Sequence, residues 1–295
     1  MEKRLIAVCV PTYRRPAMLA DCIAHVSKAT VPDGCALCVV IVDNAPEGTG
    51  EAVFEKATND CPFPILYFQE TTRGFASVRN RLVEEALKLK AHFVAFVDDD
   101  EFPSPDWLVL HLRALKASGA HVAHGPVIQI PLGESPGARE KQRLSQARST
   151  GSIKHHVSAG NVVFDTKLIA LWGLRFDAFF NRVTGEDHDF FERAKNLGAL
   201  RVWVREAVVY ESLMPERRTW GYLLARHYTG GVNNVLKFSH RHSLLQTWLH
   251  FLVRILGKLI HLVGSVLMLR PRNVVKDAAT VGGYLAALPR CGRRS

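Results

Sequence analysis

The chain of 295 residues is long enough for one large domain, or for one domain with an appendage. Its residues are 47% hydrophobic and 22% charged, which excludes wholesale disorder and allows a sizeable core. The formal net charge of +10 is concentrated in the last third, where 15 Lys and Arg residues from Arg201 onward stand against 4 Asp and Glu. This excess indicates an anionic partner there, either membrane lipid or nucleic acid.

The six cysteines do not form a strong metal motif. Cys35 and Cys38 make a lone CxxC, and neither a second pair nor a histidine cluster follows at the spacing of a zinc site. We therefore expect buried thiols in a reducing compartment. The first apolar run, at residues 5–10, is too short for a signal peptide, so the catalytic part is expected to stay in the cytoplasm.

Continuous apolar runs in the N-terminal half are typical of buried strands. They cover residues 5–10, 36–42, 65–68 and 92–97. Apolar residues at helical spacing follow the first and the third run, over residues 16–26 and 75–89. Strands that alternate with helices predict an α/β fold in which helices flank a mostly parallel, Rossmann-like central sheet.

The second half of the chain is less regular. We expect a long mobile loop at residues 132–156, where Gly, Ser, Arg and Lys are frequent. Further strands are expected at 157–164, 201–204 and 207–210, and helices at 185–196 and 219–238. The sequence thus predicts a catalytic domain at residues 1–238 and a C-terminal helical region at 239–295.

Acidic residues follow two of the predicted strands at their carboxyl ends, where ligands of such sheets bind. Asp43 comes after the second strand, and the segment FVDDDEF places Asp98, Asp99 and Asp100 after the fourth. Three adjacent carboxylates repel one another, and a hard cation such as Mg²⁺ or Mn²⁺ compensates them, often together with substrate phosphates. A solvated acidic turn is the alternative, which the position after a buried strand disfavours.

Six segments occur in the order seen in family 2 glycosyltransferases of the GT-A fold: VPTYRRP, IVDNAPEG, TTRGFASVRN, FVDDDEF, SAGNVVF and GEDHDFFERAKNLG. The chain resembles this family over residues 5–235. The later stretch YESLMPERRTW is similar to bacterial exopolysaccharide and lipopolysaccharide sugar transferases of the succinoglycan type. The resemblance implies a GT-A catalytic domain and a nucleotide diphosphate sugar as donor, with a UDP-sugar expected.

The resemblance also implies which residues bind the donor. The nucleotide side of the family's site matches Pro11, Thr12, Arg14, Asp43, Gly74, Arg79, Asn80, Asp98 and Asp99. Within this set, Asp43 matches the acid that hydrogen-bonds the base. Two alternatives remain open: Asp43 caps a turn with Asn44, and Arg79 forms a surface ion pair.

The resemblance implies a metal site and a catalytic base as well. Asp98 and Asp100 bracket the metal motif, and Asn161 matches the acceptor side. Asp187, in the pair Glu186-Asp187, matches the general base that takes the proton of the acceptor hydroxyl. A glycosidase would instead use two carboxylates and no metal. The alternative for these helical acids is a favourable interaction with the helix N-terminus.

One departure from the family concerns the metal. Many relatives carry a histidine ligand after the strand that follows the base helix, whereas this chain has Glu211 at the equivalent position. We expect either that Glu211 takes its place as an oxygen ligand or that the third protein ligand is missing. Arg217, Arg218 and His227 follow, as candidate contacts to the diphosphate or as a solvated basic face.

The apolar segment 248–269 contains two basic residues, Arg254 and Lys258. In a spanning helix each would cost about 2.5–3.5 kcal/mol near the bilayer centre. At 100° per residue they form one stripe with His250 and His261, opposite an apolar side. This pattern predicts a peripheral or monotopic helix on the cytoplasmic face of the inner or plasma membrane, with its basic stripe toward anionic headgroups. A core helix or an oligomer contact is the alternative.

The sequence therefore predicts a metal-dependent, inverting glycosyltransferase that acts on a lipid-linked glycan acceptor in bacterial surface polysaccharide or exopolysaccharide synthesis. A nucleotidyltransferase is one alternative, although VPTYRRP is not the Gly-rich phosphate loop that such an enzyme normally carries. A catalytically inactive sugar-nucleotide-binding scaffold is another, and the presence of both Asp100 and Asp187 argues against it. Nucleic acid is not an expected partner, because the basic third contains no recognised nucleic-acid motif.

Overall fold

The computed structural model describes residues 3–131, 137–153 and 157–291. The chain divides into two compact units, unit 1 at Met1–Leu213 and unit 2 at Met214–Ser295. The boundary expected at residue 238 differs from this division because it falls inside a helix of unit 2, α8 (Trp220–Arg241), which packs along its length against a later helix of the same unit.

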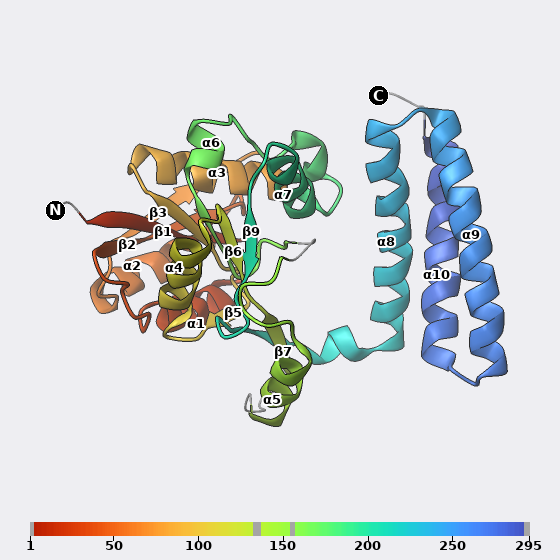
Figure 1. Cartoon of the computed structure of the whole chain (residues 1–295), viewed down its shortest axis with the longest axis horizontal. Coiled ribbons are helices and arrows are strands. Elements are labelled where there is room, and N and C mark those ends of the chain that lie inside the picture. The colour runs from red at the N-terminus through yellow and green to blue at the C-terminus, as the bar shows by residue number, and fades with distance from the viewer. Residues whose placement is uncertain (1–2, 132–136, 154–156, 292–295) are drawn as a thin grey trace. The chain divides into compact units, whose positions relative to one another are not determined.

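A seven-stranded sheet forms the centre of unit 1, in the order β3-β2-β1-β4-β8-β6-β9 (Figure 1). Its strands are β1 (Arg4–Thr12), β2 (Cys35–Asp43), β3 (Ile65–Gln69), β4 (Phe93–Phe96), β6 (Val122–His124), β8 (Val162–Asp165) and β9 (Arg201–Trp203). Only β8 runs antiparallel to its neighbours, β4 and β6. The prediction of a mostly parallel sheet is therefore confirmed.

Helices cover both faces of this sheet. They are α1 (Pro16–Val26), α2 (Glu51–Asp60), α3 (Phe75–Lys88), α4 (Trp107–Ser118), α6 (Lys167–Ala170) and α7 (Glu186–Asn196). The side chains of β1 alternate between two buried clusters, because successive residues of a strand point to opposite faces. Ala7 and Cys9 pack with α3 and α7, whereas Ile6 and Val8 pack with α1 and α4.

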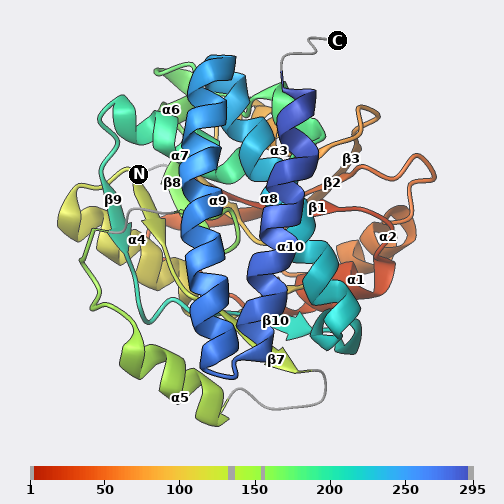
Figure 2. The ribbon, with the colours of Figure 1, turned by 90° about the vertical axis from the view of Figure 1, so that its right-hand side faces the viewer.

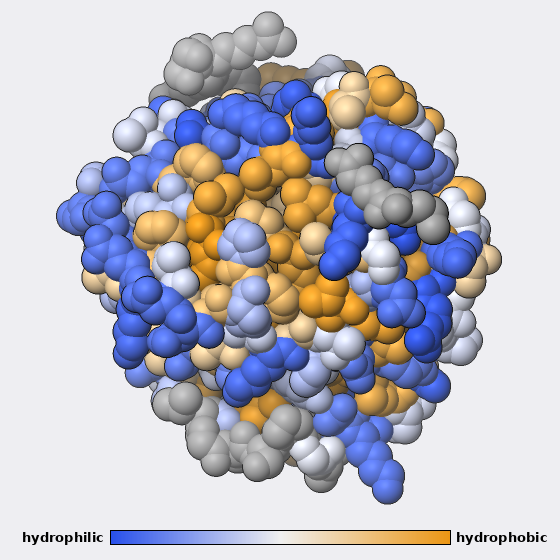
Figure 3. All heavy atoms as spheres, turned by 90° about the vertical axis from the view of Figure 1, so that its left-hand side faces the viewer, coloured by the Kyte–Doolittle hydropathy of each residue, from blue (hydrophilic) through white to orange (hydrophobic). Residues whose placement is uncertain are grey.

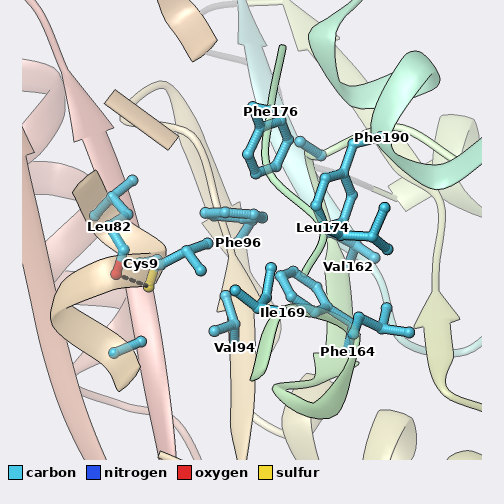
Figure 4. Close-up of a cluster of buried hydrophobic side chains, with 14 of the residues drawn as sticks. Cys9, Leu82, Val94, Phe96, Val162, Phe164, Ile169, Leu174, Phe176 and Phe190 are labelled. Carbon is cyan, nitrogen blue, oxygen red and sulfur yellow. Dashed lines mark hydrogen bonds between the residues drawn. The ribbon is translucent and has the colours of Figure 1, made fainter. Parts of the chain in front are cut away.

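The cluster on the α3 and α7 side is rich in phenylalanine, and Figure 4 shows its centre. The rings of Phe176 and Phe190 stack with their centroids 4.3 Å apart, and Phe96 of β4 packs edge-on against Phe176. This cluster joins α7 to β4, the strand that precedes Asp98, Asp99 and Asp100. These three residues are called the acidic segment below. The cluster thereby fixes the distance between the two elements on which the site is built.

A second, three-stranded sheet has the order β5-β10-β7, with β5 (Glu101–Pro103), β10 (Val209–Leu213) and β7 (Val127–Pro131). The helix α5 (Gly137–Gln146) follows β7, so the expectation of a loop over 132–156 is wrong for this part. Residues 140–146 include the good helix formers Glu, Lys, Arg and Leu. Leu144 anchors the helix on a small cluster that contains Ile128 and Val208. The expected loop residues 132–136 and 154–156 lie outside the described part.

Figure 3 shows the face of the molecule on the side of Figure 1 where β1 begins. Apolar atoms gather in its middle and hydrophilic ones surround them. The strands β1, β2 and β4 are parallel, so all three begin on this side of the sheet and have their carboxyl ends on the opposite side. The acidic segment follows β4 and therefore belongs to that other end.

Unit 2 consists of three long helices, α8, α9 (Leu244–Leu267) and α10 (Pro271–Ala287), with α9 and α10 side by side (Figure 2). The backbones of α8 and α10 meet closely at two glycines. A Cβ at Gly283 would lie 2.2 Å from the carbonyl oxygen of Tyr228, and one at Gly231 would lie 2.5 Å from that of Thr280. These contacts explain why glycine, a poor helix former, stands inside both helices.

Candidate active site

The acidic segment lies at the carboxyl end of β4, next to the loop that follows β1. Thr12 donates a hydrogen bond to Asp99 Oδ2 at 2.8 Å. The guanidinium of Arg15 lies 3.2 Å from Asp99 Oδ1 and 3.2 Å from Asp100 Oδ2. Burial raises the pKa of Asp99 to about 6, against the opposing effects of Thr12 and Arg15. The structure thus joins the two segments, and it adds Arg15, which the sequence did not single out.

Arg79 of α3 connects the acidic segment to the start of α7. Its Nη2 lies 3.2 Å from Asp98 Oδ1, its Nε lies 3.1 Å from Glu186 Oε1, and its side chain is only 6% exposed. Burial alone would lower the pKa of Arg79, but the carboxylates of Asp98, Glu186 and Asp187 raise it above its usual value. Arg79 is therefore a buried bridge between two acids, and the alternative of a surface ion pair is wrong.

Loss of this bridge should cost much of the stability of unit 1. Arg79→Met leaves Glu186 buried without a counter-charge, and breaking such a pair costs about 3–5 kcal/mol. The free energy of unfolding in urea measures the effect. The exposed Lys88→Met, on the same helix, should cost at most about 1 kcal/mol. The double variant Arg79→Met with Glu186→Gln should recover part of the loss, and an Arg79→Met protein as stable as the wild type would contradict the assignment.

The acids at the start of α7 take different partners. Gly185, at φ +112°, precedes the helix, and Glu186 points to Arg79. Asp189 lies 2.8 Å from Arg193 on the same helix. Asp187 is half-buried, and its carboxylate accepts hydrogen bonds from the backbone N–H groups of Ala159 and His188 at 3.1 and 2.6 Å. Asp187 is therefore held by backbone groups beside the bridge.

Glu101, which the sequence analysis did not select, lies under the acidic segment. It is 4% exposed, and its Oε2 accepts a hydrogen bond from the Asp98 N–H at 2.8 Å. A Cβ at Gly160 would lie 2.3 Å from its other oxygen, so only glycine leaves room for it. Burial first, and then the charges of Asp98 and Asp100, raise the pKa of Glu101 well above its usual value. The sequence signal that could have identified Glu101 is its position in FVDDDEF, directly after the three aspartates.

Glu211 lies opposite Glu101 in the small sheet, and its role as a metal ligand stays a prediction. It is paired with Glu101 in the register of β10 and β5, although 110 residues separate them in the sequence. Gln129 of β7 donates a hydrogen bond to Glu211 Oε2 at 2.9 Å. The small sheet therefore carries an additional half-buried carboxylate to the edge of the acidic segment.

Asp43, the residue expected to contact the base, has partners inside the fold. This side chain is fully buried, and its two oxygens accept hydrogen bonds from the N–H groups of Ala45 and Gly50 at 2.8 and 2.7 Å. Tyr67 donates a third at 3.1 Å. Asp43 thus shapes the loop after β2, which agrees with the alternative of a turn cap, and presents no exposed oxygen to a base.

Asn80 and Asn161 are also engaged within the fold. Asn80 exchanges two hydrogen bonds with the backbone of Phe176, at 2.9 and 2.8 Å. Asn161 is fully buried, at φ +57°, and donates to the carbonyl groups of Pro126 and Ala207. The amide groups of these two residues join separate segments of backbone, and their expected contacts to donor and acceptor stay predictions.

The remaining donor-side candidates lie around the loop after β1. Pro11 pairs with Val42 at the end of the strand, and exposed Arg14 forms an ion pair with Glu47. Gly74 precedes α3 at φ +138°. Its N–H donates to the Asn44 side chain at 2.9 Å, and a Cβ there would lie 2.4 Å from that of Asn181. Gly74 therefore serves the close approach of two segments.

Buried His111 of α4 makes the fold sensitive to acid. Its Nε2 contacts Asn161 Oδ1 at 2.8 Å, and burial lowers its pKa to about 4. Between pH 6.5 and pH 4, His111 is therefore protonated in the unfolded chain but largely neutral in the folded chain. The free energy of unfolding thus falls as the pH decreases through this window. The loss should reach about 3 kcal/mol, at 1.36 kcal/mol per pH unit.

The comparison of wild type with His111→Gln isolates this effect. The free energy of unfolding in urea, measured from pH 8 to pH 4, should fall more steeply for the wild type by about 3 kcal/mol. Equal slopes for the two proteins would show that folding does not lower the pKa of His111.

The carboxylates at 98–100 suit a divalent cation only with help from a substrate. Among the residues that the structure describes, no three His, Cys, Asp or Glu side chains are arranged to hold a metal ion by themselves. The side chains of Asp98 and Asp100 are 36% and 12% exposed. A Mg²⁺-like ion that takes one or two carboxylates and completes its shell with phosphate oxygens and water fits this donor set.

Several solved structures share the fold of this chain. The mannosyltransferase PcManGT from Pyrobaculum calidifontis, in complex with GDP-Man and Mn²⁺, matches with a TM-score of 0.64 and 17% identity over 96% of this chain and 86% of that one. S. aureus TarS 1–349 in complex with UDP matches with a TM-score of 0.58 and 15% identity, over 96% and 90%. Of a longer TarS structure, the chain covers 39%. The fold is thus that of the GT-A glycosyltransferases.

Sequence comparison then gives the family. The sequence model of Glycosyl transferase family 2 matches residues 7–179, more than half of the chain, and the chain belongs to this family. The succinoglycan biosynthesis protein ExoM of Rhizobium meliloti (strain 1021) is 30% identical over 249 residues, which make up 82% of this chain and 78% of ExoM. The resemblance seen in the sequence is confirmed.

Proposed function

We propose that this chain transfers a sugar from a nucleotide diphosphate donor, a UDP-sugar, to an acceptor hydroxyl with inversion at the anomeric carbon. One observation carries the proposal: Arg79 holds Asp98 and Glu186 together, which brings the acidic segment and the half-buried Asp187 into one site. The donor end and the base of such a reaction would then be adjacent. The nucleotides bound by TarS and the nucleotide sugars bound by TarS and PcManGT support the donor class.

On this proposal, the donor diphosphate lies at the carboxyl ends of β1 and β4. The sheet order reverses direction between these strands, and such switch points are where ligands of open α/β sheets bind. Arg15 is 44% exposed and close to the acidic segment, so it can meet a phosphate oxygen while it remains near Asp99. Asp98 and Asp100 would hold Mg²⁺ or Mn²⁺ together with phosphate oxygens of the donor, and the cation would supply positive charge at the leaving diphosphate.

Asp187 would act as the general base. Its carboxylate takes the proton of the acceptor hydroxyl, whose oxygen then forms the new bond to the anomeric carbon while the bond to the diphosphate breaks. The N–H groups of Ala159 and His188 orient the carboxylate without neutralising it. Neighbouring Glu186 and Asp189 are each engaged by an arginine, which favours Asp187 among the three.

We propose a lipid-linked glycan at the cytoplasmic face of the membrane as the acceptor. The likeness to ExoM, a succinoglycan biosynthesis protein, supports a role in polysaccharide synthesis. Unit 2 contains 13 Lys and Arg residues against 2 Asp and Glu, and this charge would attract it to anionic lipid. Both points favour an enzyme that meets its acceptor at a membrane surface.

A panel of nucleotide sugars tests the proposal. With Mn²⁺ present, one UDP-sugar should raise the melting temperature of unit 1 and be hydrolysed slowly to UDP. Binding without hydrolysis or transfer would instead support an inactive scaffold. Release of pyrophosphate would support a nucleotidyltransferase. If no nucleotide sugar shifts the melting temperature, the proposed function is wrong.

A further inference from the structure

Helix α9 carries a continuous apolar stripe on its exposed side. Its members are Leu245, Trp248, Leu249, Leu252, Val253, Leu256, Leu259, Ile260, Val263, Val266 and Leu267, each between 43% and 79% exposed. At 100° per residue they fall within an arc of about 140°. The helix has 24 residues and is about 36 Å long at 1.5 Å per residue. Contiguous apolar patches on monomeric soluble proteins rarely exceed a few hundred Å², so such a stripe indicates an interaction surface.

Three of the four residues of the basic stripe on α9 contact their own unit, which corrects the expected orientation for these three, whereas Arg254 is exposed. Lys258 Nζ lies 2.6 Å from Asp277 Oδ1 of α10, and His261 contacts the other oxygen of the same carboxylate. His250 stacks on Phe238 of α8, with ring centroids 4.1 Å apart. These basic residues therefore meet protein partners, and the sequence could not show this because Asp277 lies in another helix.

The ion pair of Lys258 with Asp277 lowers the cost of placing α9 against acyl chains. A lone Lys258 would make contact with acyl chains costly, but Asp277 is 3% exposed and supplies the opposite charge inside the bundle. Charged residues of membrane proteins commonly face the protein interior and pair with one another in this way. Helix α9 is also long and apolar enough to cross a membrane by composition. The apolar stripe of α9 thus contains no charged residue, and Lys258, on the opposite side of the helix, is paired with Asp277.

Two features favour a position along the membrane surface over a crossing one. Helices α8 and α10 pack with α9 and carry Arg226, Lys237 and Lys276. If α9 crossed the membrane, these charged helices would be drawn toward the acyl chains with it, which is costly. Basic residues also flank both ends of α9, with Arg241 before it and Arg270 after it. A helix that lies flat brings both ends to headgroup level, where anionic lipid matches these charges.

We propose that α9 lies flat in one leaflet of an anionic membrane, with its apolar stripe among the acyl chains and with its basic stripe on the opposite, water side, where Lys258 and His261 pair with Asp277 of α10. The occupant of the stripe is lipid. This inference rests on the proposed membrane partner of unit 2, but it does not depend on the sugar-transfer reaction.

Vesicle co-sedimentation of the full chain tests the proposal, with phosphatidylglycerol and phosphatidylcholine mixed in equal parts. The variant Leu252→Gln with Leu256→Gln should bind roughly 100-fold more weakly than the wild type, since the burial of each leucine is worth about tenfold or more. A matched control is Leu197→Gln with Leu200→Gln in unit 1, at 56% exposure each against 55% and 54% in the stripe. The control should bind as the wild type does.

A second variant separates the two possible orientations of α9. Lys258→Gln with Asp277→Asn removes the ion pair between α9 and α10 without net charge change and should leave vesicle binding within about twofold, because neither side chain meets lipid. Wild-type binding by the stripe variant would overturn the proposal. So would a stable dimer without lipid that the stripe variant dissociates. Hydrolysis of a UDP-sugar without vesicles, measured on each variant, reports separately on the proposed reaction.

Discussion

Asp100→Ala is expected to abolish sugar transfer and to remove the metal dependence of nucleotide diphosphate binding. The side chain of Asp100 is 12% exposed at the end of the acidic segment, with Arg15 at 3.2 Å from its carboxylate. A cation held by one or two carboxylates and the donor phosphates loses a charged ligand in this variant. Because the same cation would offset the charge of the leaving diphosphate, binding and rate should both collapse.

Calorimetric titration with UDP, with and without Mn²⁺, measures the first effect, and radiolabelled transfer measures the second. Asp60→Ala serves as the control, since Asp60 is an exposed acid at the end of α2. It should bind and transfer as the wild type does. Full activity of Asp100→Ala in the presence of EDTA would show that the acidic segment does not hold a metal.

Asp187→Asn should bind the donor normally and lose rate by roughly 10²–10⁴-fold, the usual contribution of a general base. Asparagine keeps the size of the side chain and one oxygen, so the N–H groups of Ala159 and His188 retain an acceptor. The amide cannot take the proton of the acceptor hydroxyl. The rate should therefore fall without a comparable change in the KM for the donor.

Initial rates of transfer at saturating donor give the result. Glu192→Gln is the matched control on the same helix, because Glu192 pairs with Arg201 and Lys195, away from the start of α7. It should retain the wild-type rate. A near-normal rate for Asp187→Asn would place the base on another carboxylate, with Glu186 and Asp189 the first to test.

The parts of the fold that follow from local patterns were predictable. Buried strands such as β1 and β2 are continuous apolar runs, and α3 and α7 show helical spacing, so the α/β class follows from the sequence. The strand expected at 157–164 begins only at Val162, because Asn161 has a positive φ. The antiparallel direction of β8 and the small sheet β5-β10-β7 depend on pairing between distant segments, which periodicity does not encode.

The candidate site shows the same limit. The acids at 98–100 and at 186–187 follow from motifs, and so does the nearby loop with Thr12. What the motifs cannot show is which side chains are already satisfied inside the fold. Asp43 and Asn161 match the family's pattern, yet their partners come from backbone groups that only the folded chain brings near. The motif around Arg79 predicts a contact to the donor. It does not show the buried bridge to Glu186, which lies 107 residues away in the sequence.

The link between the two units has a mechanical consequence. The chain leaves unit 1 at Leu213, the last residue of β10, and β10 is the central strand of its sheet, bonded to β7 on one edge and β5 on the other. A displacement of unit 2 therefore reaches first Ser212 and Leu213, which pair with β7 alone, and only then residues 209–211, which are paired on both edges. Glu211 lies within that clamped strand. Because Glu211 belongs to the part that is paired on both edges, movement of unit 2 should leave it in place beside Glu101.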